Sequence, residues 1–256
     1  MTRPESLAEL LAWKAPYVKH LIGNGLLVPQ GKAILFGPYK SWKSMSAIDL
    51  SFSLASGVPW LGFSTTACSV LVIQLEIPKY EYQQRILKYS LGNKLNPTTI
   101  YFENIRNLKL DKGWGIAQLE SWIQETGAQV VVIDPIYKVV SGRLTDEYDI
   151  RQFTDRMDEI IDKHKVSMVL IHHEGKDMII EGEKYDRGAD ASFGSAVFGW
   201  WCDTSIELRA EYVGSNRVEY RFPLLRLSPN DIKPFKVSIN RDNLVFEKHL
   251  EQYGTI

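Results

Sequence analysis

The sequence predicts an α/β protein: a mostly parallel sheet covered by helices on both faces, with an antiparallel strand extension near the C-terminus. Three observations predict this class. Continuous apolar runs, typical of strands buried on both faces, alternate with segments of helical periodicity as far as about residue 203. Four strand-like segments then follow one another with only turns between them. The chain has 256 residues, enough for one large domain with a sizeable core.

The predicted elements follow one another in a regular order. The strands of the alternating region are apolar runs at 33–36, 69–75, 99–102, 130–133 and 166–171. The helices between them have apolar residues three and four positions apart, over 44–56, about 80–90, 114–124 and about 150–161. The C-terminal strands are expected at 205–211, 217–227, 235–240 and 243–248, with turn-forming residues between them.

The chain is expected to divide into two parts. Residues 1–30 form an N-terminal helical segment, with one or two short helices that pack on the main domain or on a neighbouring subunit. Apolar side chains suggest these helices: Leu7, Leu10, Leu11 and Val18. Residues 31–256 are expected to form the main domain, with its strand extension beginning at about residue 204.

Charge, cysteine content and hydropathy narrow the classes of function. The chain has 30 Lys and Arg against 31 Asp and Glu, so nucleic-acid contact would need a local patch or an assembled surface. Cys68 and Cys202 lie in apolar surroundings without metal-ligand spacing, which predicts buried free thiols. No membrane-spanning run and no signal peptide are evident, so a cytoplasmic protein without a membrane partner is expected.

The segment between the first strand and the first helix predicts a phosphate-binding P-loop. Its residues, all expected to contact nucleotide, are Gly37, Pro38, Tyr39, Lys40, Ser41, Trp42, Lys43 and Ser44. Backbone N–H groups at a helix N-terminus form a concave positive site for phosphate oxygens. Lys43 would add charge near the β- and γ-phosphates, and the Ser44 hydroxyl would be a ligand of Mg²⁺. An ordinary strand–turn–helix connection is the alternative interpretation.

Trp42 stands where the P-loop pattern G-x-x-x-x-G-K-[ST] has glycine. Glycine permits backbone angles and close approaches that a bulky residue resists. Two outcomes are therefore open. Either Trp42 adopts an allowed conformation with its ring pointing away, or phosphate binding is weakened.

Two carboxylates follow predicted strands at the sheet edge where the P-loop opens. Asp134 ends the apolar strand 130–133, where it could hold Mg²⁺ directly or through water. Glu76 ends the strand 69–75, where it could orient or activate the water that attacks the γ-phosphate. The structural alternatives are a turn or cap role for Asp134 and a helix N-terminal acid for Glu76.

Histidines and a charged segment follow the last buried strand. Adjacent strand residues face opposite ways, so His172 and His173 are not expected to share a metal ion, and His173 is predicted to lie beside the γ-phosphate. Residues 174–188 are charged and aperiodic. Lys176 and Arg187 are candidates for positive charge supplied to a neighbouring subunit. A solvated surface loop is the alternative.

The motifs occur in a recognisable order: Lys40 within the P-loop, Leu75-Glu76, Ile133-Asp134-Pro135, His172-His173-x-x-Lys176, and Phe193-Gly194-Ser195-Ala196 leading to Asp203. This order resembles the RecA-like hexameric ATPases of the plasmid RepA type, related to DnaB-like replicative helicases. The resemblance covers roughly residues 25–210. It departs from the family at Trp42, at Phe193, where relatives often have arginine, and at Glu174, where a small hydroxyl residue is usual.

The resemblance implies a RecA-like P-loop NTPase core that binds ATP and Mg²⁺. It implies Lys43 and Ser44 for phosphate and Mg²⁺, Glu76 as the catalytic carboxylate, Asp134 as the Walker B acid, and His173 as the γ-phosphate sensor. Arg187 is our candidate for the arginine finger. A homo-oligomeric ring, in particular a hexamer, and single-stranded DNA are the implied partners.

The leading functional hypothesis is an ATP-hydrolysing RecA-like motor ATPase acting on DNA in plasmid, phage or mobile-element replication or recombination, with helicase activity as one form. The alternative is a nucleotide-binding regulatory or scaffold protein of the same fold with little or no hydrolysis. A third hypothesis is a regulatory ATPase with a protein substrate. Lys and Arg are spread along the chain without a dense basic stripe, so the sequence itself supplies little for DNA binding.

Overall fold

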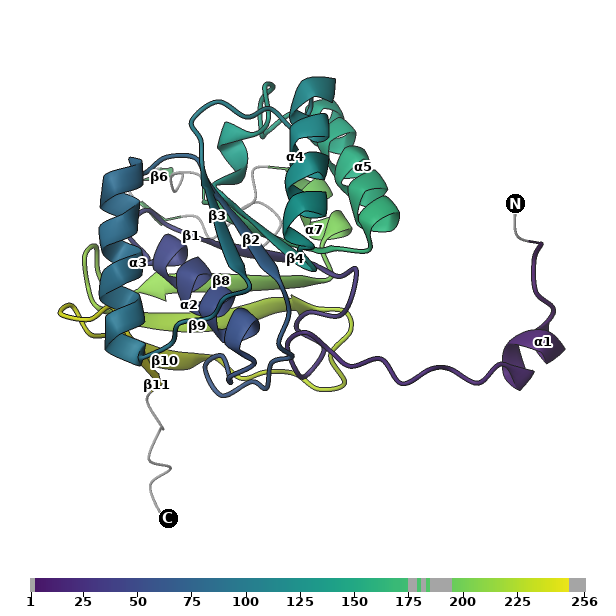
Figure 1. Cartoon of the computed structure of the whole chain (residues 1–256), viewed down its shortest axis with the longest axis horizontal. Helices are drawn as coiled ribbons and strands as arrows, with labels where there is room; N and C mark the ends of the chain where they lie inside the picture. The colour runs from purple at the N-terminus through teal and green to yellow at the C-terminus, as the bar shows by residue number, and fades with distance from the viewer. Residues whose placement is uncertain (1–2, 175–178, 181–182, 185–194, 249–256) are drawn as a thin grey trace, which may run out of the picture.

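A nine-stranded sheet organises the chain in the computed structural model (Figure 1), which describes residues 3–174, 179–180, 183–184 and 195–248. Its order is β11-β10-β9-β8-β1-β5-β4-β2-β3. The strands are β1 Lys32–Gly37, β2 Val70–Gln74, β3 Ile100–Asn104, β4 Val130–Asp134, β5 Ser167–His173, β8 Thr204–Ala210, β9 Arg217–Leu225, β10 Phe235–Ile239 and β11 Phe246–Lys248. A separate antiparallel pair is formed by β6 Ile179–Ile180 and β7 Glu183–Lys184.

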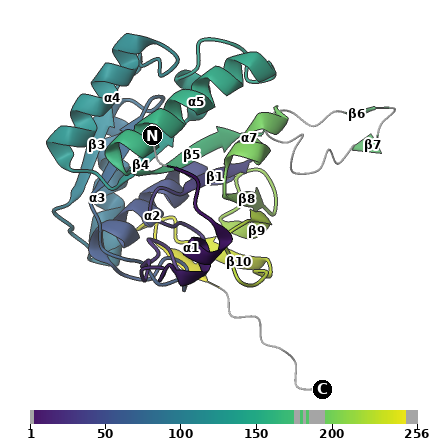
Figure 2. The same ribbon diagram turned by 90° about the vertical axis from the view of Figure 1, so that its right-hand side faces the viewer.

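Helices cover both faces of the sheet, as predicted (Figures 1 and 2). The helices are α1 Leu7–Ala12, α2 Lys43–Ser56, α3 Lys79–Asn93, α4 Gly113–Thr126, η1 Ile136–Lys138, α5 Glu147–His164 and α7 Ala196–Trp201. Alternation along β1 divides the core: Ile34 and Phe36 face the cluster with α4, α5 and α7, whereas Ala33 and Leu35 face the cluster with α2. Helix α3 packs outside α2 through a third cluster.

Strand direction changes within the C-terminal part. β1 pairs in parallel with β5 on one side and with β8 on the other. β9, β10 and β11 then add antiparallel strands. The antiparallel extension therefore begins at Arg217 rather than near residue 204, because the connection from β5 to β8 includes α7 and crosses over to a parallel strand.

The N-terminal segment has two different parts. Helix α1 is capped by Ser6, buries none of its residues, and stands away from the sheet on an extended arm (Figure 1). The residues just before β1 instead belong to the core: Leu21, Ile22, Leu26 and Leu27. The pattern that predicts one or two helices thus corresponds to one helix in the described residues.

Two further features concern the whole described chain. Cys68 and Cys202 are both buried and unpaired with each other, as predicted for free thiols. Among the described residues, no helix combines the length and the hydropathy that a bilayer crossing requires.

A buried carboxyl joins α2 to α3. Asp49 on α2 is 8% exposed, and its Oδ1 accepts a hydrogen bond of 2.5 Å from the Tyr89 hydroxyl on α3. Burial raises the pKa of Asp49 to about 6, although the hydrogen bond from Tyr89 opposes the shift. At neutral pH the helix that follows the P-loop therefore carries a buried charge without a cationic partner among the causes of that shift.

Asp49→Asn is expected to stabilise the protein in a pH-dependent way. The folded pKa of about 6 lies above the ordinary 3.8, so protonation stabilises the fold below pH 4, and this contribution is lost as pH rises through 6. Asparagine avoids the buried charge and still accepts from Tyr89. We expect the free energy of unfolding to rise by about 1–3 kcal/mol at pH 7.5 and by much less at pH 4.5.

Urea unfolding at the two pH values measures this difference. The exposed Asp155→Asn on α5 is the matched control, and its stability should change little at either pH. A gain for Asp49→Asn that is absent at pH 7.5, or equal at both pH values, contradicts the prediction.

Candidate functional site

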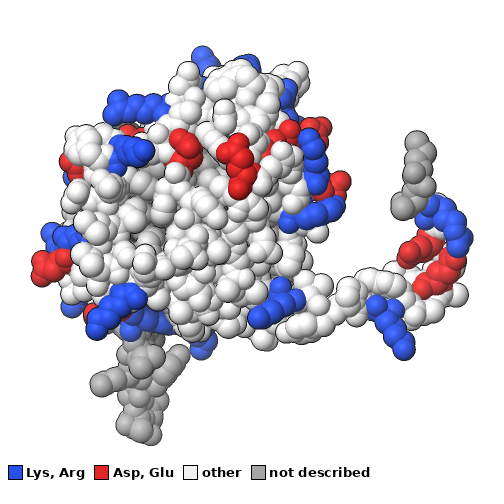
Figure 3. Space-filling model, viewed as in Figure 1, with Lys and Arg blue, Asp and Glu red and all other residues white. Residues whose placement is uncertain are grey.

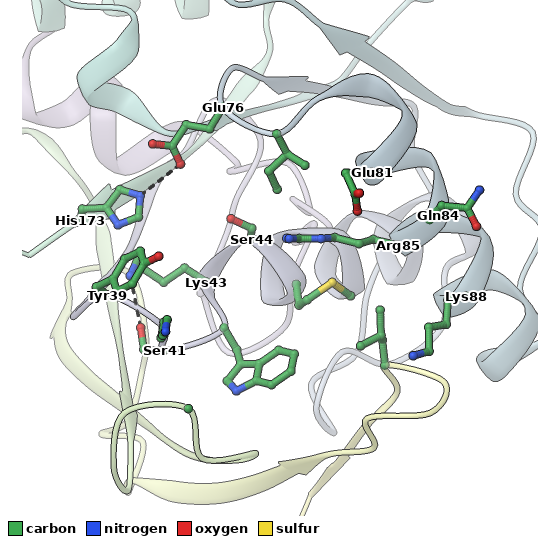
Figure 4. Close-up of a pocket in the computed structure, with 16 residues that line it drawn as sticks. Tyr39, Ser41, Lys43, Ser44, Glu76, Glu81, Gln84, Arg85, Lys88 and His173 are labelled. Carbon is green, nitrogen blue, oxygen red and sulfur yellow. Dashed lines mark hydrogen bonds and ion pairs between the residues drawn. The ribbon is translucent and has the colours of Figure 1, made fainter.

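The carboxyl ends of four parallel strands meet at one edge of the sheet and form a cavity of about 610 Å³ (Figure 4). The loop after β1 supplies the cavity residues Tyr39 to Ser44. Glu76 follows β2, and His173 ends β5. Parallel strands place their carboxyl ends together, which explains why residues far apart in sequence line one cavity.

The loop begins with a close contact between β1 and β8. Gly37 has a φ of 150°, and a Cβ built on it would lie 2.2 Å from the carbonyl oxygen of Leu208. No side chain fits in that space. Glycine is therefore required at the first position of the loop for a steric reason.

Trp42 occupies the left-handed region, with φ 66° and ψ 19°, as the residue that precedes α2. That region costs an L-residue about 1–2 kcal/mol. Its indole Nε1 donates a 2.6 Å hydrogen bond to the carbonyl of Ser215 in the turn between β8 and β9. Of the two outcomes that the sequence leaves open, the structure has the allowed backbone conformation with a ring that leaves the loop.

The amine of Lys43 lies inside the loop. Its Nζ donates to the carbonyls of Gly37 at 2.8 Å and Pro38 at 2.6 Å, and to Ser41 Oγ at 3.2 Å. Burial lowers the pKa of Lys43 to about 8, while the nearby carboxylates of Asp134, Glu174 and Glu76 oppose this shift. A phosphate oxygen entering the loop would meet this cation.

Asp134 ends β4 at the base of the cavity and is 2% exposed. Its Oδ2 accepts from Gln74 Nε2 at 2.9 Å, whereas Oδ1 has no hydrogen bond of regular geometry. Burial raises the pKa of Asp134 to about 6, and the nearby Ser44 hydroxyl lowers it. The buried carboxylate oxygen and the hydroxyl are a donor pair that fits Mg²⁺, which takes only one or two protein ligands and completes its shell with water and phosphate.

No larger metal cluster is present in the part of the chain that the structure describes: no group of three or more His, Cys, Asp or Glu could hold an ion. His172 and His173 diverge as expected from adjacent strand positions. His172 is 3% exposed with its ring 5.6 Å from that of Phe198, while His173 lines the cavity. Arg187 and Lys176 lie outside the described residues.

Gln74 joins the two acidic strand ends and is not among the residues predicted from the sequence. Its Nε2 donates to Asp134, and its Oε1 accepts from the backbone N–H groups of Glu76 at 2.7 Å and Ile77 at 3.2 Å. One polar residue in an otherwise apolar strand was the available signal, because a buried amide needs partners.

Tyr137 also escaped prediction. It lies on η1, three residues after Asp134, and its hydroxyl donates to Glu76 Oε1. Glu76 Oε2 is 3.7 Å from His173 Nε2, and the rings of Tyr137 and His173 meet edge-on at 5.8 Å. Burial and then Lys43 lower the pKa of His173, whereas Glu76 opposes this; burial and then Glu76 raise the pKa of Tyr137. Glu76 thus has a donor on each oxygen when His173 Nε2 carries a proton.

One face of α3 forms the remaining wall of the cavity. Its residues follow the helical i, i+3, i+4, i+7 spacing: Glu81, Gln84, Arg85 and Lys88. Figure 4 shows Arg85 extending from α3 toward Ser44. This polar face was visible in the sequence as spacing, but only its position opposite the loop assigns it to the site.

The fold and the arrangement at the strand ends define a RecA-like P-loop ATPase. The AAA domain family matches residues 2–178 of the chain, which therefore belongs to that family. A comparison with curated protein sequences found no match.

Solved structures of ATPases and of proteins named for their action on DNA share this fold. A crystallised ATPase domain matches with a TM-score of 0.64 and 12% identity, over 85% of this chain and 84% of that one. The RadB recombinase matches with a TM-score of 0.56 and 16% identity, over 84% and 90%. A DnaB-like replicative helicase matches with a TM-score of 0.64 and 12% identity, over 85% of this chain and 58% of the helicase. At these identities the likeness establishes the shared fold.

Gly37→Ala is expected to destabilise the protein by at least about 2 kcal/mol, because the added methyl group meets the Leu208 carbonyl. Gly113→Ala is the matched control: a Cβ at Gly113, in the first turn of α4, has nothing within 4 Å. Chemical unfolding measures both variants. If Gly37→Ala is as stable as Gly113→Ala, the close approach of β1 to β8 is not the reason for glycine at this position.

Proposed function

We propose that this chain is an ATP-hydrolysing RecA-like motor ATPase that acts on DNA in plasmid, phage or mobile-element replication or recombination. One observation carries the proposal: Lys43, Glu76, Asp134 and His173, from four strand ends, surround one cavity or its base. The fold shared with a DnaB-like helicase and a recombinase supports an action on DNA. Helicase activity is part of the proposal.

The loop would bind the triphosphate. Residues Gly37 to Ser44 would surround the phosphates with backbone N–H groups, and Lys43 would exchange its contacts with loop carbonyls for phosphate oxygens. Ser44 and Asp134 would hold Mg²⁺, which neutralises charge on the phosphate oxygens when bound. Burial of both charged groups strengthens these interactions, because little water competes with them.

Glu76 and His173 would act at the γ-phosphate end. The carboxylate of Glu76 would orient the attacking water and accept its proton. The hydroxyl of Tyr137 would hold this carboxylate in place from the η1 side. A largely neutral His173, favoured by burial and by Lys43, could hydrogen-bond to a phosphate oxygen without adding a full charge. Arg187 remains our candidate for the arginine finger supplied by a neighbouring subunit.

Assembly and DNA binding are further parts of the proposal. A finger supplied in trans requires a homo-oligomer, for which we propose a hexameric ring in the cytoplasm, with single-stranded DNA as the partner. On the face seen in Figure 3, basic side chains are scattered among acidic and uncharged ones. Arg221 contacts Glu219, and Arg226 donates to the carbonyls of Gly199 and Trp200. A DNA surface would therefore arise from several subunits together.

A nucleotide-binding regulatory or scaffold protein without appreciable hydrolysis is the second candidate. The observation that favours it is the loop itself, where Trp42 replaces glycine and the Lys43 amine already has three protein acceptors. Nucleotide-dependent assembly without phosphate release would support this candidate over the motor.

Lys43→Ala is expected to lower ATP turnover at least about 100-fold, because it removes the cation that meets the β- and γ-phosphates. Phosphate release is measured with Mg²⁺, with and without single-stranded DNA. Lys233→Ala, an exposed lysine outside the cavity, should keep wild-type turnover. Equal background release by the wild type and Lys43→Ala would rule out the motor.

Tyr137→Phe is expected to lower kcat about tenfold and to leave the KM for ATP nearly unchanged. It removes only the donor to Glu76 Oε1, and a carboxylate held less firmly positions water less well. Steady-state kinetics measures both constants. Tyr148→Phe, an exposed tyrosine on α5, is the control. An unchanged kcat for Tyr137→Phe would show that the hydroxyl does not position Glu76 during turnover.

A further inference from the structure

Trp42 connects the candidate phosphate loop to a distant turn. The indole N–H of Trp42 donates to the Ser215 carbonyl at 2.6 Å, across 173 positions of sequence. The ring packs against two buried clusters, one that contains Tyr220 of β9 and one that contains Tyr82 of α3. A glycine at this position would have neither contact.

The turn that accepts this hydrogen bond is itself ordered. Ser215 is 1% exposed, and its amide donates to the Tyr212 carbonyl at 2.9 Å. Its hydroxyl oxygen accepts from the backbone N–H of Arg217 at 3.0 Å. Arg241 donates at 2.6 Å to the carbonyl of the neighbouring Gly214, which also lines the cavity. Trp42 therefore binds a carbonyl whose position the turn determines.

The left-handed conformation of Trp42 depends on this partner. Nothing in an L-residue favours that backbone region, so contacts elsewhere must offset its cost. The indole hydrogen bond and the ring packing are the contacts that Trp42 makes. Because the peptide groups on both sides of Trp42 belong to the loop, their orientation is linked to the turn through this one side chain.

We propose that Trp42 is a positioning residue that couples phosphate binding in the loop to the order of the β8–β9 turn. The inference rests on the proposed function, since it takes residues 37–44 as the phosphate site. A ligand that fixes the loop then also fixes Ser215, and by reciprocity a fixed turn favours the binding-competent loop. Tyr212 and Val213, both exposed next to this site, are thereby under the control of the nucleotide.

Amide hydrogen exchange on the full chain tests the coupling, with and without Mg·ATP. The reporters are the amides of Ser215 and Arg217, together with that of Glu211, which donates to the Arg217 carbonyl at 3.1 Å. In the wild type, Mg·ATP should slow exchange both at 38–44 and at 211–217. In Trp42→Phe, which keeps a ring but loses the donor, exchange should still slow at 38–44 but change less than about twofold at 211–217.

A second comparison needs no nucleotide. Without the indole donor, residues 211–217 should exchange about fivefold to tenfold faster in Trp42→Phe than in the wild type, as expected for the loss of one hydrogen bond. Trp114→Phe, the same change at an exposed tryptophan on α4, is the matched control and should behave as the wild type. Unchanged exchange in β4 verifies that each variant is folded.

The outcomes separate the two proposals. If Mg·ATP protects 211–217 equally in the wild type and in Trp42→Phe, the coupling through Trp42 is overturned. If Mg·ATP protects 38–44 in the wild type but leaves 211–217 unchanged, it is overturned as well. If Mg·ATP does not protect 38–44 in the wild type, the proposed function fails. The nucleotide-free comparison then decides the connection alone: equal exchange at 211–217 overturns it, and faster exchange in the variant supports it.

Discussion

The site depends on the parallel pairing of β1 with β5, β5 with β4 and β4 with β2. Parallel strands in register bring their carboxyl ends to one edge, and each end here carries a polar group into the same region. The P-loop, Glu76, Asp134 and His173 are thereby placed without any long loop. The buried amide of Gln74 then connects Asp134 to the turn that carries Glu76, so these two acids are placed together rather than independently.

Burial gives the site its electrostatic character. Burial lowers the pKa of Lys43 to about 8 and raises that of Asp134 to about 6, so both groups are held closer to neutrality than they would be in water. Each nevertheless acts on the other with opposite sign, and this attraction offsets part of the desolvation cost. Such groups gain most from a ligand that brings phosphate charge and a divalent ion together, which is the chemistry we propose for the cavity.

Much of the fold could be predicted because period and local composition are properties of contiguous residues. The five buried strands of the alternating region and the four helices between them occur where the apolar runs and spacings place them, with ends that differ by a few residues. The direction of β8 was a different matter. Its sequence resembles that of the antiparallel strands after it, and only the crossover through α7 makes it parallel to β1. The polar face of α3 and the hydroxyl of Tyr137 likewise acquire a place in the site only through packing.

Which residues can end a strand beside a phosphate site follows from the sequence alone: a glycine-led loop with lysine and serine, an aspartate, a glutamate and a histidine, each after an apolar run. That information is local, since strand period and the chemistry of a strand end involve only neighbouring residues. What happens at Trp42 is settled by long-range packing instead. Its left-handed backbone is offset by a carbonyl 173 positions away, and no local pattern records which distant group will lie within hydrogen-bonding distance of an indole.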